Sequence, residues 1–418
     1  MASRRHATHS LIDPFALAAI VMLFVQLLAV KKATGCLMDE ALPTPYAKAV
    51  RKIYSTAFQS GNLKLAMPRM TSAIHKMLSV IEASRINGPI DVQELFVKMT
   101  LDVIGAVALG SSLGGLDGSR PLHSLIIDAG LVGRQRLYDP LKRIRCNLFP
   151  KSKEALKDAA VIDALSDEFD KLVSELYARE PSSTDMESIW LKFRTLKDPR
   201  TGDIITREKF RLEISVAIIA GMDTTGHQLA WILALLATHP HIAAKVLNEL
   251  SECGLCGKEM KAIEFDDFSD LPYLTAVIRE GMRLSHVIVM CFPRLVPKDM
   301  SIMGYRVPKG TIIVCPGDQG FSTKADWGDP NVFRPERWLS GEDMSSKYTM
   351  PFSVGPKDCP GQRLALLEMR LAVVEILRRY QLHMEGTYED LKSTAKDGLV
   401  IEADEGIWID FTPRATFR

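Results

Sequence analysis

One cysteine lies in a loop whose composition suits a reactive or ligating thiol. Cys359 stands between Gly355-Pro356 and Pro360-Gly361, directly before a long helical pattern. The unpaired N–H groups and the dipole at a helix N-terminus favour an anion, so they stabilise a thiolate there. Glycines on both sides let the backbone approach a flat ligand closely. The alternative is a buried structural cysteine, which is the commoner role of a single cysteine.

A second set of polar residues interrupts a long apolar helical pattern. Ala220-Gly221-Met222-Asp223-Thr224-Thr225 lies in the middle of a helix predicted over Arg207 to Thr238. Glycine inside a helix costs about 1 kcal/mol relative to alanine, and a threonine hydroxyl can bond to a carbonyl one turn earlier and bend the helix. Such a break makes room for a small molecule beside a hydroxyl and a carboxylate. The alternatives are a simple kink and a threonine that faces a packed neighbour.

A carboxylate and two guanidinium groups form a third set. Glu280 and Arg283 lie one turn apart on one helix face, and Arg337 follows in a Pro-Glu-Arg-Trp segment. A pair at this spacing is most often solvated. Arg279 lies one turn before Arg283 and repels it, which favours a dedicated acidic partner. A glutamate with two arginine partners can be buried, because the network is then satisfied.

The elements that must position these residues are mostly helices. Helical periodicity covers Val92 to Leu109, Ala159 to Tyr177, Arg207 to Thr238, Leu271 to Ser285 and Gln362 to Tyr380. Met303 to Val314 switches to strand-like residues around Pro308-Lys309-Gly310 and predicts a small hairpin, and Leu399 to Phe411 predicts a second one. The sequence therefore predicts one large domain over residues 45–418, mainly α with small β-sheets, of the α+β class.

These motifs stand in the order and relative spacing of one family. From Arg51 to the C-terminus, the chain resembles the haem-thiolate monooxygenases, the cytochrome P450 superfamily. The resemblance rests on Phe-x-x-Gly-x-x-x-Cys-x-Gly, from Phe352 to Gly361, together with the upstream Glu-x-x-Arg. This combination is highly specific, although either motif alone is weak. It implies a long central helix over a haem and the cysteine loop beneath it.

The resemblance also implies roles for individual residues. Cys359 would be the axial thiolate of the haem iron, the only protein ligand to the metal, and would favour O–O cleavage. Thr224 would hydrogen-bond dioxygen and Asp223 would help deliver protons, which makes these two the catalytic residues. The other residues expected to contact or shape the cofactor site are Phe352, Gly355, Lys357, Gly361, Arg294, Arg51, Ala220 and Gly221.

A structural triad, a substrate and redox partners follow from the same resemblance. Glu280, Arg283 and Arg337 would form a buried structural triad behind the haem. The apolar small-molecule substrate would lie against Ile214, Ala217, Ile218, Val287, Ile288 and Val289. The cofactor would be haem b, dioxygen would be the co-substrate, and electrons would come from NADPH through a flavin-containing reductase.

The chain departs from the family pattern in three places. Lys357 stands two residues before the cysteine, where arginine is usual, and lysine lacks the bidentate fork. Ala47 stands where a tryptophan is common, four residues before Arg51. Only Lys31 to Lys48 separates an apolar run from the helix with Arg51, where members normally carry a hinge, a helix and a sheet. The alternative function is therefore an N-terminally truncated, haem-poor or non-catalytic relative of the same fold.

Residues 1–34 predict a targeting segment that anchors the chain in a membrane. Phe15 to Val30 is apolar apart from Gln26 and is flanked by Arg4-Arg5 and Lys31-Lys32. A membrane span needs about 20 apolar residues, so this run is slightly short. A cleaved targeting peptide and a buried helix are the alternatives. The expected location is the endoplasmic reticulum membrane, with the catalytic domain on the cytosolic side, and a plastid is the alternative.

Composition argues against several other classes of protein. The 418 residues include 52 Lys and Arg against 51 Asp and Glu, so the chain lacks the basic excess of nucleic-acid-binding proteins. Hydrophobic residues make up 47% and charged residues 25%, which is typical of a globular protein and not of a disordered one. Seven scattered cysteines predict free thiols and no secreted disulfide framework.

Overall fold

The computed structural model describes residues 44–181, 188–257, 260–288, 294–313, 327–339, 351–355, 358–396 and 400–415. The predicted anchor at residues 1–34, Lys357 and Val289 lie outside these ranges. For Arg294, the structure describes the backbone only. Contacts divide the chain into two compact units. Of the described residues, the smaller unit contains Ser124–Glu168, and the larger contains the rest.

The smaller unit is built from helices alone within its described residues. It contains α5 (Leu122–Tyr138) from residue 124 onward, α6 (Pro140–Leu148) and the first part of α7 (Lys153–Ala178). Asp139 caps α6 by accepting a hydrogen bond from the Lys142 N–H at 2.8 Å. The buried Asp158 accepts from Arg136 Nε at 2.8 Å and from Lys142 Nζ at 3.3 Å. This ion-pair network joins the three helices.

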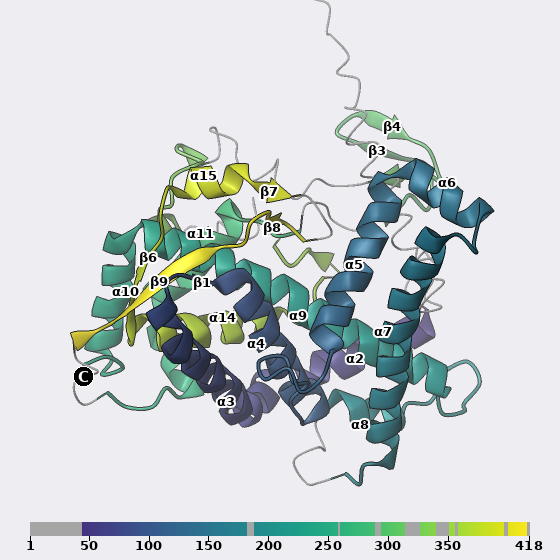
Figure 1. Cartoon of the computed structure of the whole chain (residues 1–418), viewed down its shortest axis with the longest axis horizontal. Coiled ribbons are helices and arrows are strands. Elements are labelled where there is room, and N and C mark those ends of the chain that lie inside the picture. Colours follow the sequence, from purple (N-terminus) through teal and green to yellow (C-terminus); the bar gives the residue numbers. More distant parts are fainter. Residues whose placement is uncertain are drawn as a thin grey trace, which may run out of the picture. The chain divides into compact units, whose positions relative to one another are not determined.

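The larger unit is organised around α9 (Figure 1). Its other α-helices are the second part of α7, from residue 169 onward, together with α2 (Pro45–Ala57), α3 (Ser60–Ser84), α4 (Val92–Ile104), α8 (Ile189–Arg194), α10 (Pro240–Glu252), α11 (Pro272–Leu284), α14 (Gln362–Leu377) and α15 (Tyr388–Ser393). Helix α9 spans Arg207–Thr238, as predicted, with the Thr206 side chain as its N-cap, and Pro240 opens the next helix. It is buried along most of its length and packs against α4, α8, α10, α11 and α14.

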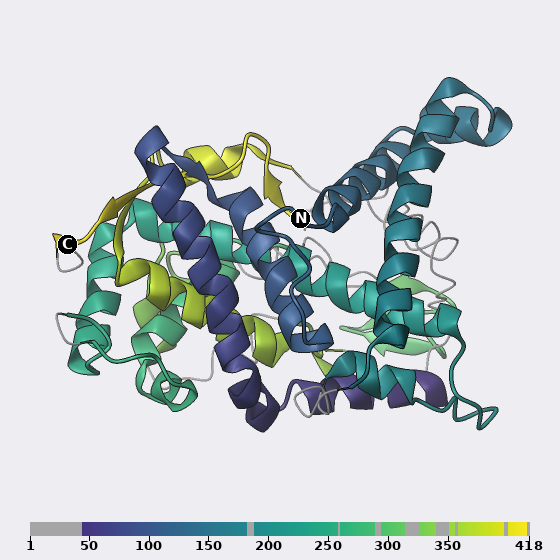
Figure 2. The same cartoon turned by 60° about the horizontal axis from the view of Figure 1, so that its bottom comes forward.

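Helices α4 and α9 approach each other closely. A Cβ added at Gly226 would lie 2.7 Å from the Val97 Cα, and one added at Gly221 would lie 2.9 Å from the Ile104 side chain. The buried Thr100 hydroxyl on α4 donates to the carbonyl of Met222 on α9 at 2.8 Å. On the other side of this pair, α3 lies next to α4 (Figure 2). The glycines of α9 therefore allow two backbones to pack without intervening side chains.

The β structure consists of one three-stranded and three two-stranded antiparallel sheets among the described residues. The strand order β1 (Ile90–Asp91), β9 (Trp408–Pro413), β6 (Tyr380–His383) forms the largest sheet, and the pairs are β2 (Arg294–Leu295) with β5 (Ile312–Ile313), β3 (Met300–Ile302) with β4 (Tyr305–Val307), and β7 (Ala395–Lys396) with β8 (Glu402–Ala403). The predicted class, mainly α with small β-sheets, is confirmed.

Both predicted hairpins are wrong in their pairing. Strand β4 pairs backward with β3 through a turn at Met303 and Gly304, whose φ angles of 49° and 87° suit a tight two-residue turn. Strand β5 pairs with β2, so Pro308-Lys309-Gly310 connects two different sheets. In the C-terminal region, β8 pairs with β7, whereas β9 pairs with β1 and β6. The pairing of strands of two or three residues depends on turn geometry and on segments far away in the sequence. Local sequence patterns do not contain this information.

Within the described ranges, no single helix is both long enough and apolar enough to cross a membrane. Helices α9 and α10 meet that condition only when taken together, and the chain bends by 103° between them.

Replacing Gly226 tests the close packing of α4 and α9. Gly226→Ala is expected to lower the free energy of unfolding by about 1–3 kcal/mol, because the new methyl group would overlap the Val97 backbone. Gly130→Ala in α5 is the matched control, since a Cβ there meets nothing within 4 Å. Urea unfolding followed by circular dichroism measures both variants, and equal stability for Gly226→Ala and wild type would contradict the close approach.

Candidate functional site

The loop before α14 holds Cys359 in a defined backbone conformation. The Cys359 N–H donates to the Phe352 carbonyl at 2.8 Å, and the Asp358 N–H donates to the Gly355 carbonyl at 3.1 Å. Gly355 has a φ of 83°, a left-handed conformation that favours glycine. A Cβ there would meet nothing within 4 Å, so the turn and not a lack of space requires this glycine.

The electrostatic surroundings of the thiol combine opposing effects. The Cys359 side chain is accessible to solvent, yet nearby protein atoms desolvate it and raise the pKa of its thiol. The N–H groups of Gly361 and Gln362, at the start of α14, lower this pKa, as does the charge of Arg51. The amide donors predicted from the sequence are therefore present, but burial outweighs them and the pKa stays above its ordinary value. Metal binding at such a thiol displaces its proton.

Helix α2 connects the cysteine loop with α9. Arg51 Nη1 donates to the Asp358 carbonyl at 2.7 Å, and Nη2 pairs with the Asp358 carboxylate. On the same helix, the Tyr46 hydroxyl donates to Glu213 Oε1 and the Tyr54 hydroxyl to the Glu213 carbonyl, both at 3.0 Å. One helix thus contacts both the residue before the thiol and the first half of α9. The contact of Arg51 with the cofactor stays a prediction.

One face of α9 is open, although most of the helix is buried. Val216 is 41% exposed, Ala220 is exposed and Thr224 is partly accessible. Their spacing of four residues places them along one side of the helix. The Thr224 hydroxyl donates to the Ala220 carbonyl at 2.9 Å, the predicted bond to the preceding turn, and α9 remains helical throughout. This face carries both an apolar surface and a hydroxyl.

The residues predicted to face the substrate differ in accessibility. Ile214, Ala217, Ile218 and Val287 are buried among protein neighbours, whereas Ile288 is partly accessible. Sequence reasoning missed Val216, although its position four residues before Ala220 already places it on the open face. A Cβ added at Gly221 would overlap the Ile104 side chain, so helix packing explains this glycine as well. The predicted contacts of these residues with a substrate or with the cofactor stay predictions.

Asp223 lies beside a histidine that sequence reasoning also missed. His227, one turn later on α9, is buried, and its Nδ1 lies 2.8 Å from the Asp223 carbonyl and 3.2 Å from Oδ1. Its Nε2 lies 3.8 Å from Glu402 Oε2 on β8. Burial lowers the pKa of His227, but the hydrogen bond and charge of Asp223, with the charge of Glu402, raise it above its ordinary value.

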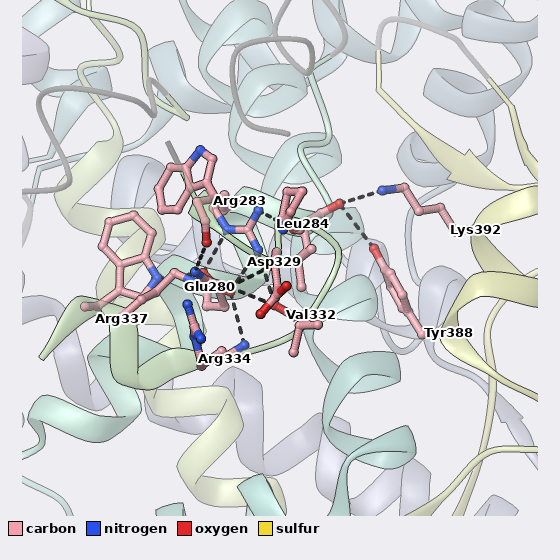
Figure 3. A network of polar contacts seen from close by, with 12 residues as sticks. Glu280, Arg283, Leu284, Asp329, Val332, Arg334, Arg337, Tyr388 and Lys392 are labelled. Carbon is pink, nitrogen blue, oxygen red and sulfur yellow. Dashed lines mark hydrogen bonds and ion pairs between the residues drawn. The ribbon is translucent and has the colours of Figure 1, made fainter. Parts of the chain in front are cut away.

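The predicted triad is assembled around one fully buried carboxylate (Figure 3). Glu280 accepts from Arg283 Nε at 2.9 Å and Nη2 at 2.8 Å, and from Arg337 Nε at 2.8 Å. The Trp338 indole N–H and the Arg334 backbone N–H also donate to it, at 2.8 and 3.1 Å. The structure therefore brings Glu280, Arg283 and Arg337 together.

Both guanidinium groups also bind the segment 327–339. Arg283 Nη1 donates to the Pro330 carbonyl at 2.7 Å, and Arg337 Nη1 donates to the Trp327 carbonyl at 2.9 Å. The two groups lie 4.8 and 5.7 Å from the Trp327 ring centroid, within range of cation–π attraction. The carboxylate offsets one of the two positive charges, and the carbonyls of the segment accept hydrogen bonds from other guanidinium N–H groups. This network fixes the segment to α11.

An accessible cysteine at a helix N-terminus and a hydroxyl–carboxylate pair on a long central helix define a protein of the haem-thiolate class. A cytochrome P450 family model matches residues 26–409, so the chain belongs to the cytochrome P450 family. Membership of this family indicates, in general terms, a haem monooxygenase that uses haem iron and dioxygen.

Individual relatives agree with this family. Cytochrome P450 monooxygenase ORF11 of Penicillium roqueforti is 30% identical over 359 residues, which cover 82% of this chain and 70% of that protein. Cytochrome P450 3A6 of Oryctolagus cuniculus is 26% identical over 372 residues, 85% of this chain and 70% of the relative. Cytochrome P450 monooxygenase atr2 of Stereocaulon alpinum is 28% identical over 327 residues, which cover 76% of this chain and 62% of that protein.

A solved structure shows the same fold. The crystal structure of a cytochrome P450 (CYP102L1) has a TM-score of 0.77 and 22% sequence identity, and the match covers 94% of this chain and 84% of that one.

The residues present fit a haem. Cys359 offers a soft sulfur ligand that is accessible to solvent, and two backbone N–H groups act on it. Helix α2 links the loop to α9, whose open face carries Ala220 and Thr224. The backbone of Arg294 lies in β2, opposite Ile313.

Removing the charge of Glu280 tests the triad. Glu280→Gln is expected to lower the free energy of unfolding by about 3–5 kcal/mol, because two buried guanidinium groups lose the carboxylate that they share. Asp266→Asn is the matched control, since its ion pair with Lys64 is exposed and such pairs contribute little to stability. Chemical denaturation measures both, and a loss no larger than that of the control would refute a structural role for the triad.

The buried Glu213 predicts a pH effect on stability. Burial raises the pKa of Glu213 from 4.5 to about 7. Between these values the folded chain holds one more proton than the unfolded chain, so this group's contribution to stability falls as the pH rises. Glu213→Gln removes that loss and keeps an acceptor for Tyr46. The variant is expected to gain up to about 3 kcal/mol over wild type above pH 7, and nothing below pH 4.5.

The pH dependence of urea unfolding measures this effect. Glu208→Gln, at an exposed position one turn earlier on α9, is the control and should follow the wild type over the same range. A constant difference between Glu213→Gln and wild type at every pH would show that the carboxyl group titrates normally.

Proposed function

We propose that this protein is a monooxygenase that inserts one oxygen atom of dioxygen into an apolar organic substrate, with electrons from NADPH delivered by a flavin-containing reductase. The observation that carries the proposal is the accessible Cys359 thiol, held by its loop at the start of α14 beside two backbone N–H donors. Membership of the cytochrome P450 family supports haem chemistry at this thiol.

Haem b, when bound, supplies the redox-active iron at which dioxygen is activated. Cys359 would be its ligand, and the turn at Gly355 sets the direction of the thiol. A Cβ added at Gly361 would lie 3.8 Å from the Cys359 sulfur, so the backbone stays close to the ligand atom. The residues proposed to contact the rest of the cofactor are Phe352, Lys357, Arg294, Arg51, Ala220 and Gly221.

Thr224 and Asp223 are proposed to handle oxygen and protons. The Thr224 hydroxyl is anchored on the Ala220 carbonyl and keeps its acceptor lone pairs on the open face of α9. The Asp223 carboxylate contacts His227 and is partly accessible, so it can exchange a proton. Together they offer a hydroxyl and an acid within one residue of each other.

The open face of α9 supports an apolar substrate. Val216 and Ala220 present small aliphatic side chains there, and Ile288 is partly accessible at the end of the segment after α11. An aliphatic surface that is not covered by other side chains gains free energy by contact with an apolar molecule. The triad around Glu280 is proposed to act structurally, since its donors are all bound within the protein.

We propose a membrane location, at the endoplasmic reticulum with the catalytic domain in the cytosol. The apolar run Phe15 to Val30, with basic residues on both sides, supports this proposal. A plastid membrane is the alternative that the basic, acid-free start of the chain supports.

The absorption spectrum of the dithionite-reduced protein, with and without carbon monoxide, tests the proposed function. Wild type is expected to show a strongly red-shifted Soret band, and Cys359→Ala is expected to lose it because the thiolate ligand is gone. Cys256→Ala is the matched control and should keep the band. A wild-type chain without bound haem would instead support the haem-poor relative of the same fold.

A further inference from the structure

A cluster of titratable groups connects the middle of α9 with the protein surface. His227 Nδ1 lies 2.8 Å from the Asp223 carbonyl and 3.2 Å from its Oδ1, and Nε2 lies 3.8 Å from Glu402 Oε2. The His227 side chain is 5% exposed, whereas that of Glu402 is 28% exposed. The side chain of Asp223 is 26% exposed, so the buried imidazole lies between two partly exposed carboxylates, one on α9 and one on β8.

The Glu402 carboxylate is held in place by contacts of its own strand with α9 and α4. The Trp231 indole N–H on α9 donates to the Ile401 carbonyl at 3.2 Å. On α4, Gln93 accepts from the Ala403 N–H at 2.8 Å and donates to its carbonyl at 3.3 Å. Both neighbours of Glu402 are thus hydrogen-bonded to helices. The position of Glu402 beside His227 is a fixed feature of the fold.

We infer that His227 relays protons from Glu402 and solvent to Asp223, and so supplies the acid that oxygen activation consumes. This role rests on the proposed function and goes beyond the pair of Asp223 and Thr224. Among the described residues, no hydrogen bond joins His227 to Thr224. His227 therefore acts through Asp223, as a positioning and relay residue.

The step balances without any additional reagent. The Nδ1–H bond of the imidazolium breaks as an O–H bond forms on Asp223 Oδ1, which leaves neutral imidazole. The proton that remains at Nε2 then moves to Nδ1 by tautomerisation through solvent, which frees the Nε2 lone pair. The O–H bond of protonated Glu402, or of water at Glu402, breaks as a new N–H bond forms at Nε2, and solvent replaces the proton that was given up. Only protons move, and the electrons of the overall reaction come from the reductase.

Other charged groups face the same cluster. His123, at the start of α5, interacts electrostatically with Asp223 and with His227, and α4 contributes Lys98 and Glu94 beside it. Burial and the charge of Lys98 lower the pKa of His123, whereas Asp223 and Glu402 raise the pKa of His227. Of the two histidines, His227 is therefore the one whose protonated form its surroundings favour.

The test uses the haem-loaded protein, reconstituted with an NADPH-dependent flavin reductase. The rate of NADPH oxidation in the presence of dioxygen is expected to fall in wild type as the pH rises through the pKa of His227, because neutral imidazole has no proton to give. His227→Gln is expected to slow this rate at least about tenfold near neutral pH and to flatten its pH profile. His241→Gln, exposed on α10, is the matched control and should keep both.

A second measurement does not depend on activity. In histidine-labelled protein, NMR titration is expected to place the pKa of His227 above that of an ordinary histidine, and Glu402→Gln is expected to lower it. Glu402→Gln should also slow NADPH oxidation, but less than His227→Gln, because water at the surface can replace this carboxylate. Because Glu402 is partly exposed, Glu402→Gln tests the relay even if His227→Gln fails to fold.

The outcomes separate the relay from the proposed function. Each variant is first checked for the reduced carbon monoxide band, so that loss of haem is not mistaken for loss of proton supply. An unchanged pH profile in His227→Gln with its haem intact would overturn the relay and leave the monooxygenase proposal standing. A wild type that binds no haem would overturn the proposed function, while the NMR titration still reports whether Glu402 and His227 interact.

Discussion

The close packing of α4 against α9 is the constraint on which the arrangement of the site depends. The glycines at 221 and 226 bring the two backbones together, and the Thr100 hydroxyl binds the Met222 carbonyl across the contact. These contacts fix the rotation of α9 about its own axis. Because one side of the helix is committed to α4, the side with Val216, Ala220 and Thr224 remains open. The direction of the Thr224 hydroxyl, which is proposed to be catalytic, is thus set by the packing of α4 against α9.

Ion pairs and charge-assisted hydrogen bonds hold the remaining parts of the site in place. Glu280 holds two guanidinium groups, and these in turn hold the carbonyls of the segment 327–339. Arg51 plays a comparable role for the cysteine loop, since it binds both the carbonyl and the carboxylate of Asp358. Charge-assisted hydrogen bonds are strong and directional, so they can position irregular segments that lack a hydrogen-bonded ladder. Apolar packing orients the helices, and ion pairs orient the loops.

The sequence predicted those features that local patterns encode. The bounds of α9 were predicted to the residue, because its apolar pattern is long and a threonine and a proline mark its ends. Helical spacing paired Glu280 with Arg283, and the buried triad with Arg337 followed from the resemblance to the cytochrome P450 superfamily. The strand partners of β4 and β5 were not predictable, since two- and three-residue strands carry little pattern. His227 was missed for a similar reason, because its significance depends on Glu402, far along the chain.

The open face of α9 also indicates where this enzyme can tolerate variation. Val216 and Ala220 are exposed on that side, whereas Ala217 and Ile218, close to them in the chain, are buried. A change of side-chain size at Val216 would alter the accessible surface of this face and leave the folding core unaltered. The same change at Ala217 or Ile218 would overpack the core and lower stability. Positions of α9 that tolerate variation and positions that determine stability are therefore separated by a fraction of a helical turn.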